Sequence, residues 1–126
     1  MKITYSEALS FRSFYSKIKD NKFPLRTGYR LNCIAKAIDN QFSFYQEQLA
    51  AILNEFAEKD AQGNIARDND GNFKVPPEKI AECNMKLNDL LLFEFDIEAK
   101  PLNISELEAL ELEMDEIQGI MAFITE

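Results

Sequence analysis

The 126-residue chain contains no histidine and no tryptophan, only two cysteines and four glycines, and no lysine or arginine among its last 26 residues. Without histidine there is no His-based catalytic triad and no side chain that ordinarily titrates near neutral pH. The glycines stand singly, so no phosphate-binding loop of the GxxxxGK[ST] or GxGxxG type is present. The sequence therefore predicts no enzyme, no cofactor site and no metal site.

The two cysteines, Cys33 and Cys83, do not form a CxxC pair. Each lies within an apolar helical pattern, which predicts buried free thiols rather than a disulfide. Free thiols suit a reducing cytoplasm. No apolar run is long enough for a signal peptide or a bilayer span, so we expect a cytoplasmic protein without membrane contact.

Size and composition predict one folded domain over residues 1–126. Hydrophobic residues make up 46% of the chain, including ten phenylalanines, which is enough to bury a core without metals or disulfides. Neither an internal repeat nor a low-complexity linker is evident. The expected fold class is mainly α with a small β element (α+β).

The helical core is predicted over residues 29–58 and 77–92, as a helical hairpin or small bundle. Apolar residues in the first segment recur at alternating steps of four and three: Leu31, Ala35, Ile38, Phe42, Tyr45, Leu49, Ile52 and Phe56. The second segment follows two prolines that suit a helix start. A capping box at residues 4–7 (TYSE) predicts a further helix near the N-terminus.

Short β elements are predicted between and after the long helices. Asp/Gly-rich turns at residues 60–63 and 68–71 predict a β-hairpin over 64–75. Alternating apolar and polar residues predict strands within 93–104. Residues 105–126 are expected to form acidic C-terminal helices, the first of them opened by a capping box of Ser105 and Glu108.

Charge is sorted along the chain. Residues 1–50 hold eight Lys or Arg and four Asp or Glu, a net of +4, whereas residues 51–126 hold six and eighteen, a net of −12; together these give −8. Such asymmetry bears on partners and association rather than on fold.

The acidic C-terminal segment is the leading candidate for contact with a partner. If residues 106–116 formed one helix, six carboxylates would lie along about 15 Å; a plain solvated helix face is the commoner explanation of such a run, and partner contact is the alternative. These partner-binding candidates are Glu106, Glu108, Glu111, Glu113, Asp115 and Glu116. A second, weaker and basic surface comprises Lys19, Lys22, Arg26 and Arg30. The hairpin tip Asp68–Gly71 is a third candidate, because exposed loop tips often make contacts.

Other constellations fit less well. Aligning Gly71 with the glycine of an EF-hand loop puts Ala66 and Pro77 where an acid and a bidentate glutamate are needed, so a turn explains the segment better. Carboxylate pairs are abundant, but nothing places a pair in a cleft. Aromatic residues interleave the basic stretch 17–30 as in some single-strand binders, yet helical spacing assigns them to the core. The sequence therefore favours a protein over a nucleic acid as partner.

Three stretches follow one another along the chain: TYSEALSFRSFYSKIKDNKFPLRTGYRL at the start, EFAEKDAQGNIARDNDGNFKV in the middle and LNISELEALELEMDEIQGIMAFI near the end. This order of long helix, Asp/Gly-rich hairpin, helix and Leu/Glu-rich tail resembles a family of small bacteriophage proteins of unknown function. The resemblance implies a phage-encoded protein that acts in the cytoplasm of the infected bacterium or in the virion, and it assigns no functional residues. In outline, two helices joined by a β-hairpin also resemble prefoldin subunits, a likeness of fold only.

These observations predict a non-enzymatic phage accessory protein that binds a host or phage protein through its acidic C-terminal half. A host nucleic-acid-handling or defence protein, inhibited by this contact, is one such target. The alternative is a structural or assembly component of the particle, a homo-oligomer in which the +4 and −12 halves meet between neighbouring copies. A third hypothesis, an enzyme or single-strand binder, requires a bound metal or retention on oligonucleotide.

Overall fold

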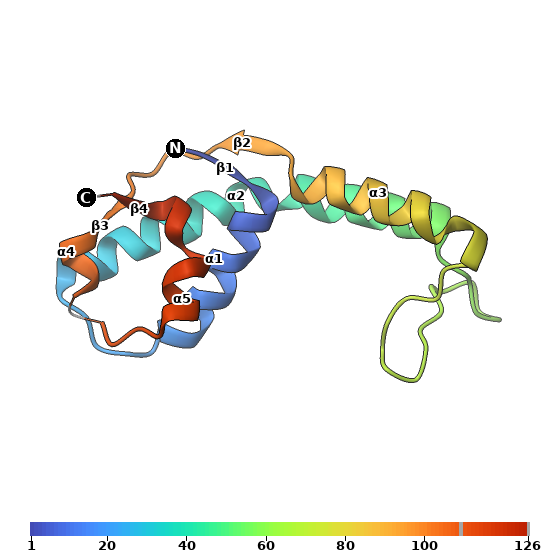
Figure 1. Cartoon of the computed structure of the whole chain (residues 1–126), viewed down its shortest axis with the longest axis horizontal. Helices are drawn as coiled ribbons and strands as arrows, with labels where there is room; N and C mark the ends of the chain where they lie inside the picture. Colours follow the sequence, from blue (N-terminus) through green and yellow to red (C-terminus); the bar gives the residue numbers. More distant parts are fainter. Residues whose placement is uncertain (109, 126) are drawn as a thin grey trace. The chain divides into compact units, whose positions relative to one another are not determined.

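The computed structural model of the chain describes residues 1–108 and 110–125. Its elements follow one another as β1 (Lys2–Thr4), α1 (Tyr5–Ile18), α2 (Leu25–Phe56), the 3₁₀ helix η1 (Pro77–Lys79), α3 (Ile80–Leu91), β2 (Glu94–Asp96), β3 (Leu102–Asn103), α4 (Ile104–Leu107), α5 (Met114–Gly119), the 3₁₀ helix η2 (Met121–Phe123) and β4 (Ile124–Thr125) (Figure 1). The mainly α class with a small β element is confirmed.

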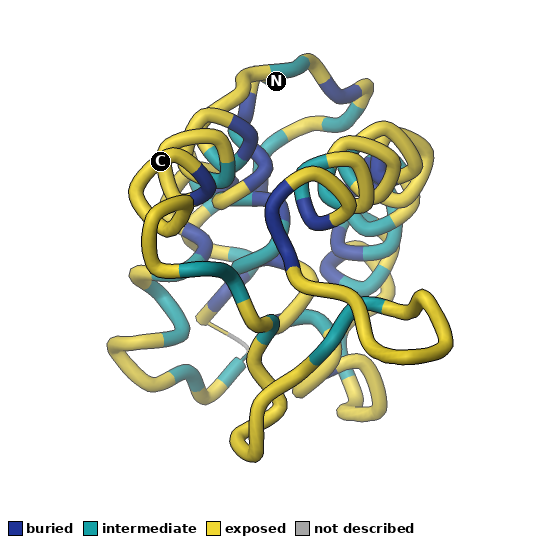
Figure 2. Tube along the Cα trace, turned by 90° about the vertical axis from the view of Figure 1, so that its right-hand side faces the viewer, coloured by how far each residue is buried: buried dark blue, intermediate teal, exposed yellow. Residues whose placement is uncertain are grey.

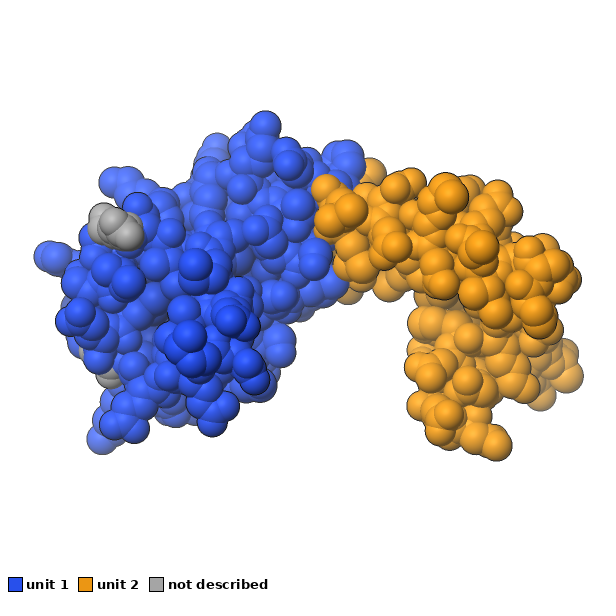
Figure 3. Space-filling view, in the orientation of Figure 1, with its two compact units in different colours: residues 1–42, 93–126 blue, residues 43–92 orange. Residues whose placement is uncertain are grey.

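Where one domain was expected, the chain divides into two compact units. Unit 1 comprises Met1–Phe42 and Phe93–Glu126, and unit 2 comprises Ser43–Leu92 (Figure 3). Helix α2 supplies its first part to unit 1 and its last part to unit 2. A helix of 32 residues is about 48 Å long, more than one small core covers, so each part of α2 has its own apolar neighbours.

Unit 1 begins with the capping box predicted for α1. The Glu7 amide donates to Thr4 Oγ1 at 3.2 Å, and the Thr4 amide donates to Glu7 Oε1 at 2.9 Å. Just before the helix, β1 pairs antiparallel with β2, with Ile3 opposite Phe95. The sequence had predicted β2 but not β1, because three residues are too few for an alternation to be recognised.

The core of unit 1 draws on both ends of the chain. Its buried members come from β1, α1, the first part of α2 and the segment after β2: Ile3, Ala8, Phe11, Phe14, Ile18, Leu31, Ile34, Ile38, Ile97, Leu102, Leu107, Ile120 and Phe123. Figure 2 shows buried positions along the helices and mainly exposed positions in the connecting loops. Burial also raises the pKa of the Tyr5 phenol, whose O–H donates to the Gln41 carbonyl at 3.0 Å.

Helix α2 begins at Leu25, four residues before the predicted start. Gly28 lies inside this helix. A glycine lowers helix stability by only about 1 kcal/mol relative to alanine, and the burial of Thr27 and Leu31 on the same helix offsets this cost. The buried face also differs from the predicted stripe. Ile34 and Leu53 are buried, whereas the predicted stripe contained Ala35 and Ile52, which are only half-buried. The reason is that a straight helix drifts about 20° per heptad from a 3.5-residue repeat.

Unit 2 is a helical hairpin, as predicted, formed by the last part of α2 and by α3. Lys86 of α3 joins the helices: its Nζ lies 3.1 Å from Glu55 Oε2 and 5.2 Å from the Phe56 ring centroid. The buried residues between them are Leu53, Phe56, Ala57, Cys83 and Leu90. The thiols are free, as predicted; Cys83 is buried and Cys33 half-buried.

The turn of the predicted hairpin over 64–75 has the expected residues but little strand around it. The backbones of Arg67 and Phe73 form an isolated antiparallel β-bridge. Within the turn, Asp68 Oδ1 accepts hydrogen bonds from the Asp70 and Asn72 amides at 2.9 and 3.0 Å. Gly71 completes the turn at φ +84°, a conformation that favours glycine.

Residues 59–65 repeat this arrangement, which corrects the expectation of no internal repeat. The backbones of Lys59 and Ile65 form the corresponding β-bridge, and Gly63 has φ +83°. Asp60 Oδ1 accepts hydrogen bonds from the Gln62 and Asn64 amides, both at 2.9 Å. In the sequence the unit is (K/R)-D-x-x-G-N-(I/F), recurring after eight residues. Two backbone hydrogen bonds at the same period, Ala66 N–H to Glu58 O and Lys74 N–H to Ala66 O, are joined by a third, Glu58 N–H to Lys74 O, which closes a ring.

Replacing Asp68 by alanine is expected to open its turn. The two amides that donate hydrogen bonds to this carboxylate would lose their acceptor. Hydrogen exchange at these amides should therefore accelerate about tenfold, which corresponds to about 1.4 kcal/mol. Asp70→Ala is the control, since it removes the same charge but no accepted hydrogen bond. Hydrogen exchange measures both; equal acceleration in the two variants would mean that charge, not the turn, controls the loop.

The C-terminal segment departs most from prediction. Helix α4 is capped by Asn103, whose Oδ1 accepts from the Ser105 amide at 2.9 Å, so the predicted Ser105 cap is wrong. Residues 106–116 do not form one helix, the case considered for the spacing of their acids, because α4 ends at Leu107 and α5 begins at Met114. Leu107, Leu110 and Leu112 all pack on the core, which one straight helix face does not allow. The chain ends in β4, which pairs parallel with β3.

Candidate partner-binding surfaces

Glu106 lies inside unit 1 rather than on a contact surface. Its Oε1 is 3.2 Å from Arg30 Nε, its backbone carbonyl accepts from Thr27 Oγ1 at 3.3 Å, and its side chain is only 13% exposed. Its Oε2 is buried and has no hydrogen-bond partner within the described part of the chain. Glu106 is therefore no longer a candidate for partner contact. It forms an ion pair with Arg30 inside unit 1.

Glu113 and Glu116 also have a structural role, at the start of α5. The Glu113 amide donates to Glu116 Oε1 at 3.2 Å, which caps this short helix. The two glutamates and Asp115 line a pocket of about 510 Å³ together with Lys17 of α1, which packs beside α5 (Figure 1). Basic and acidic halves of the chain thus meet within unit 1, at this pocket and at the Arg30–Glu106 pair.

The remaining acids of the predicted set, Glu108, Glu111 and Asp115, are exposed. None of them forms an ion pair with any residue that the structure describes. Only part of the predicted acidic surface is therefore available to a partner, and its carboxylates do not lie along one helix.

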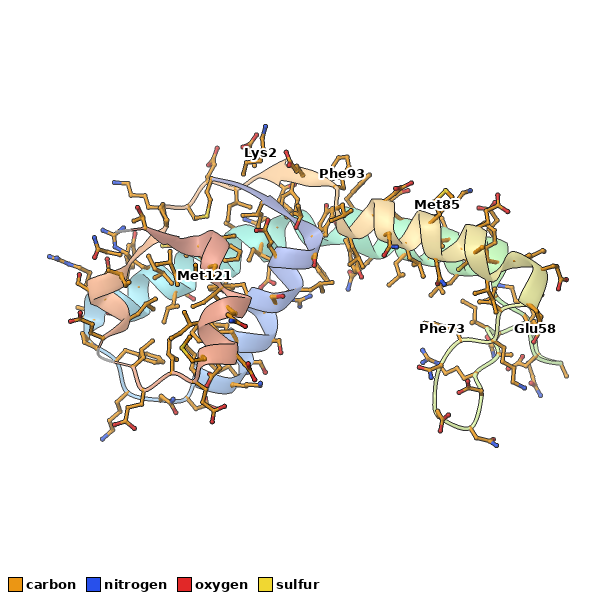
Figure 4. The ribbon with its side chains drawn as sticks, in the orientation of Figure 1. Lys2, Glu58, Phe73, Met85, Phe93 and Met121 are labelled. Atoms are coloured by element: carbon orange, nitrogen blue, oxygen red, sulfur yellow. The ribbon has the colours of Figure 1, made fainter. Side chains whose placement is uncertain are left out.

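An apolar groove that was not predicted lies next to one of these acids, Glu108. It has a volume of about 390 Å³, and Glu108 lies on its wall. Its apolar lining comes from α4, the following loop, α5, η2 and β4: Ile104, Leu107, Leu110, Leu112, Ile117, Met121 and Ile124. Ile104 and Met121, the latter labelled in Figure 4, are 53% and 61% exposed. Leucines interleaved with acids were the available signal in the sequence.

The second predicted surface separates into two parts. Arg26 and Arg30 line a pocket of about 730 Å³ together with Lys100, which the sequence did not connect with them. Lys19 and Lys22 are exposed in the connection between α1 and α2 and do not line this pocket.

The third candidate, the tip Asp68–Gly71, is exposed and well supported. Arg67 Nη1 donates to the Gly71 carbonyl at 2.8 Å, and its guanidinium carbon lies 4.2 Å from the Phe73 ring centroid (Figure 4). These contacts stabilise the loop. A pocket of about 490 Å³ lies beside it, and its lining includes Asp68, Phe73 and Ile80 of α3.

Within residues 1–108 and 110–125, no group of three or more His, Cys, Asp or Glu side chains is placed to hold a metal ion. No helix in the same described part of the chain is long and apolar enough to cross a membrane. Comparison with known proteins adds no assignment: no family model, curated protein or solved structure matches the chain.

Proposed function

We propose that this protein is a non-enzymatic, phage-type accessory protein that holds a basic segment of another protein against its C-terminal groove. The observation that carries the proposal is the juxtaposition of an open apolar groove with exposed acids that have no cationic partner in the described chain. An apolar side chain of the partner would enter beside Met121, and flanking lysines or arginines would reach Glu108 and Glu111. The phage origin rests on the family resemblance of the sequence.

Charge complementarity selects this occupant. An acidic rim repels another acidic segment and attracts a basic one, which speeds encounter and sets orientation, whereas burial of apolar surface supplies most of the affinity. A basic, apolar segment is common in proteins that handle nucleic acid, which is the reason to propose such a host protein as the target. The cytoplasm of the infected cell is then the expected location.

Binding should depend on both parts of the surface. Neutralising the acidic rim (Glu108→Gln and Glu111→Gln) is expected to weaken partner binding about tenfold, because exposed ion pairs contribute about 0.2–1 kcal/mol each. The matched control is Glu47→Gln and Glu94→Gln, which removes the same amount of negative charge from exposed positions elsewhere. Each variant has a net charge of −6, that is, −8 plus two.

The apolar part is tested by Met121→Gln, with Met85→Gln in α3 as control, since these methionines are 61% and 64% exposed (Figure 4). The partner captured from host lysate is identified by mass spectrometry and purified, and its Kd is then measured for every variant at low and high salt. The proposal requires Met121→Gln and the rim variant to weaken binding while both controls bind normally. Affinity that is insensitive to salt and to these substitutions would refute it.

The alternative function, a component of the virion, predicts association of copies through opposite charges. Light scattering of the purified chain and mass spectrometry of virions distinguish it from the accessory function. A monomer that is absent from virions would exclude it.

A further inference from the structure

A different pocket in unit 1, on the basic side of α2, combines cationic and apolar side chains. Its α2 wall consists of Arg26, Tyr29, Arg30 and Cys33, which recur at i, i+3, i+4 and i+7 and so share one helix face. The facing wall is the loop of residues 97–100, and Met1 also lines the pocket. Its volume of about 730 Å³ lies within the range of small-molecule sites, about 300–1,000 Å³.

The cations of this pocket are not all neutralised within the chain. Arg30 is engaged by Glu106, and this contact fixes the guanidinium while its other N–H groups can still donate. Arg26 and Lys100 form no ion pair with any residue in the described ranges. Three cationic side chains therefore line the pocket with a single carboxylate, that of Glu98.

The rest of the lining is apolar or aromatic. Ile97 is 4% exposed and forms part of the unit 1 core, and Cys33 lies beside it in the pocket lining. Tyr29 is 68% exposed and offers a ring face to a bound molecule. Sites for small molecules commonly combine such an apolar lining with a few charged groups that fix the ligand's orientation.

We propose that this pocket binds a small organic anion, with a phosphate or carboxylate head between Arg26 and Lys100 and an apolar or aromatic body against Tyr29 and Ile97. Arg30, positioned by Glu106, supplies further donors to the head group. This site is separate from the C-terminal groove, so it stands or falls independently of the proposed function.

The test uses the full chain and three defined probes: phenyl phosphate, 3-phenylpropionate and inorganic phosphate. Binding is followed by calorimetry and by the NMR shifts of the amides of residues 26–33 and 97–100. We expect one or both phenyl compounds to bind at one site and to shift both amide groups. Inorganic phosphate should bind at least tenfold more weakly, because it lacks the body that covers apolar surface.

Substitutions identify the groups responsible. Arg26→Gln and Lys100→Gln should each weaken binding of the phenyl probe about tenfold, as expected when a charged hydrogen-bond donor is lost. Glu98→Gln should strengthen it severalfold, since it removes the opposing carboxylate; this gain cannot result from misfolding. Lys19→Gln and Lys22→Gln, which remove nearby charges outside the pocket, should leave the affinity unchanged.

Three outcomes would overturn the proposal. The first is no shift of the two amide groups with either phenyl probe at millimolar concentration. The second is equal affinity for inorganic phosphate and phenyl phosphate, which would show that only charge is recognised. The third is that the chain binds a single-stranded oligonucleotide and that Lys19→Gln weakens this binding as much as Arg26→Gln does. This result would indicate a diffuse nucleic-acid-binding surface.

Discussion

Replacing Phe123 by alanine is expected to lower the free energy of unfolding by about 3–5 kcal/mol, the range for a large buried aromatic residue. Phe123 has no exposed surface, and its ring centroid lies 4.8 Å from that of Phe11 in α1. Since proteins of this size have a total stability of about 5–15 kcal/mol, such a loss would remove a large fraction of it. Urea unfolding followed by circular dichroism measures the change.

Met121→Ala is the control for this prediction. It truncates a side chain two residues earlier in the same 3₁₀ helix, but Met121 is 61% exposed, so the loss should stay within about 0.5 kcal/mol. Similar losses in the two variants, or a small loss for Phe123→Ala, would mean that the C-terminal segment is not part of the unit 1 core.

Glu106→Gln is the second substitution with a large expected effect. It removes the charge that faces Arg30 at 3.2 Å in a site where the glutamate side chain is only 13% exposed. Leaving the Arg30 charge without its partner in this partly buried site costs about 1–3 kcal/mol, and loss of that amount in the free energy of unfolding is expected. Glu108→Gln, an exposed neighbour without an ion pair, should change stability by less than about 0.5 kcal/mol.

A double-mutant cycle separates the ion pair from other effects of the substitution. If Glu106 acts through Arg30, the losses in Glu106→Gln and Arg30→Gln should not add, and the coupling energy should exceed about 0.5 kcal/mol. Additive losses would show that the two side chains stabilise unit 1 separately. A loss in Glu106→Gln would also show that this glutamate, contrary to what the acidic pattern alone suggests, cannot be neutralised without cost to stability.

The C-terminal acids show why sequence patterns located the charge but not its use. Glu106 and Glu108 are alike in the sequence, both acids beside a leucine, yet one pairs with Arg30 and the other faces solvent. Arg30 and Glu106 are 76 residues apart along the chain. No local pattern contains such a contact, because it depends on how α4 packs against α2.

The groove and the pocket beside α2 depend on the same kind of long-range packing. Lys100 joins Arg26 only because the loop after β2 lies beside the start of α2. The groove requires η2 and β4 to return to α4, and the sequence predicted a helix in their place. Two-residue strands have no periodicity of their own and are stable only when a partner strand is present.

The sequence by itself determined the elements whose causes are local. The Thr4 cap follows from side chains that bond to amides within one helical turn, the long helices from apolar residues at steps of three and four, and the turns from aspartate and glycine three residues apart. Tertiary structure alone decided which acids are exposed, which arginine is neutralised and where the apolar groove lies. These properties depend on burial and on distances between residues far apart in the chain, and the packing of the two cores sets them.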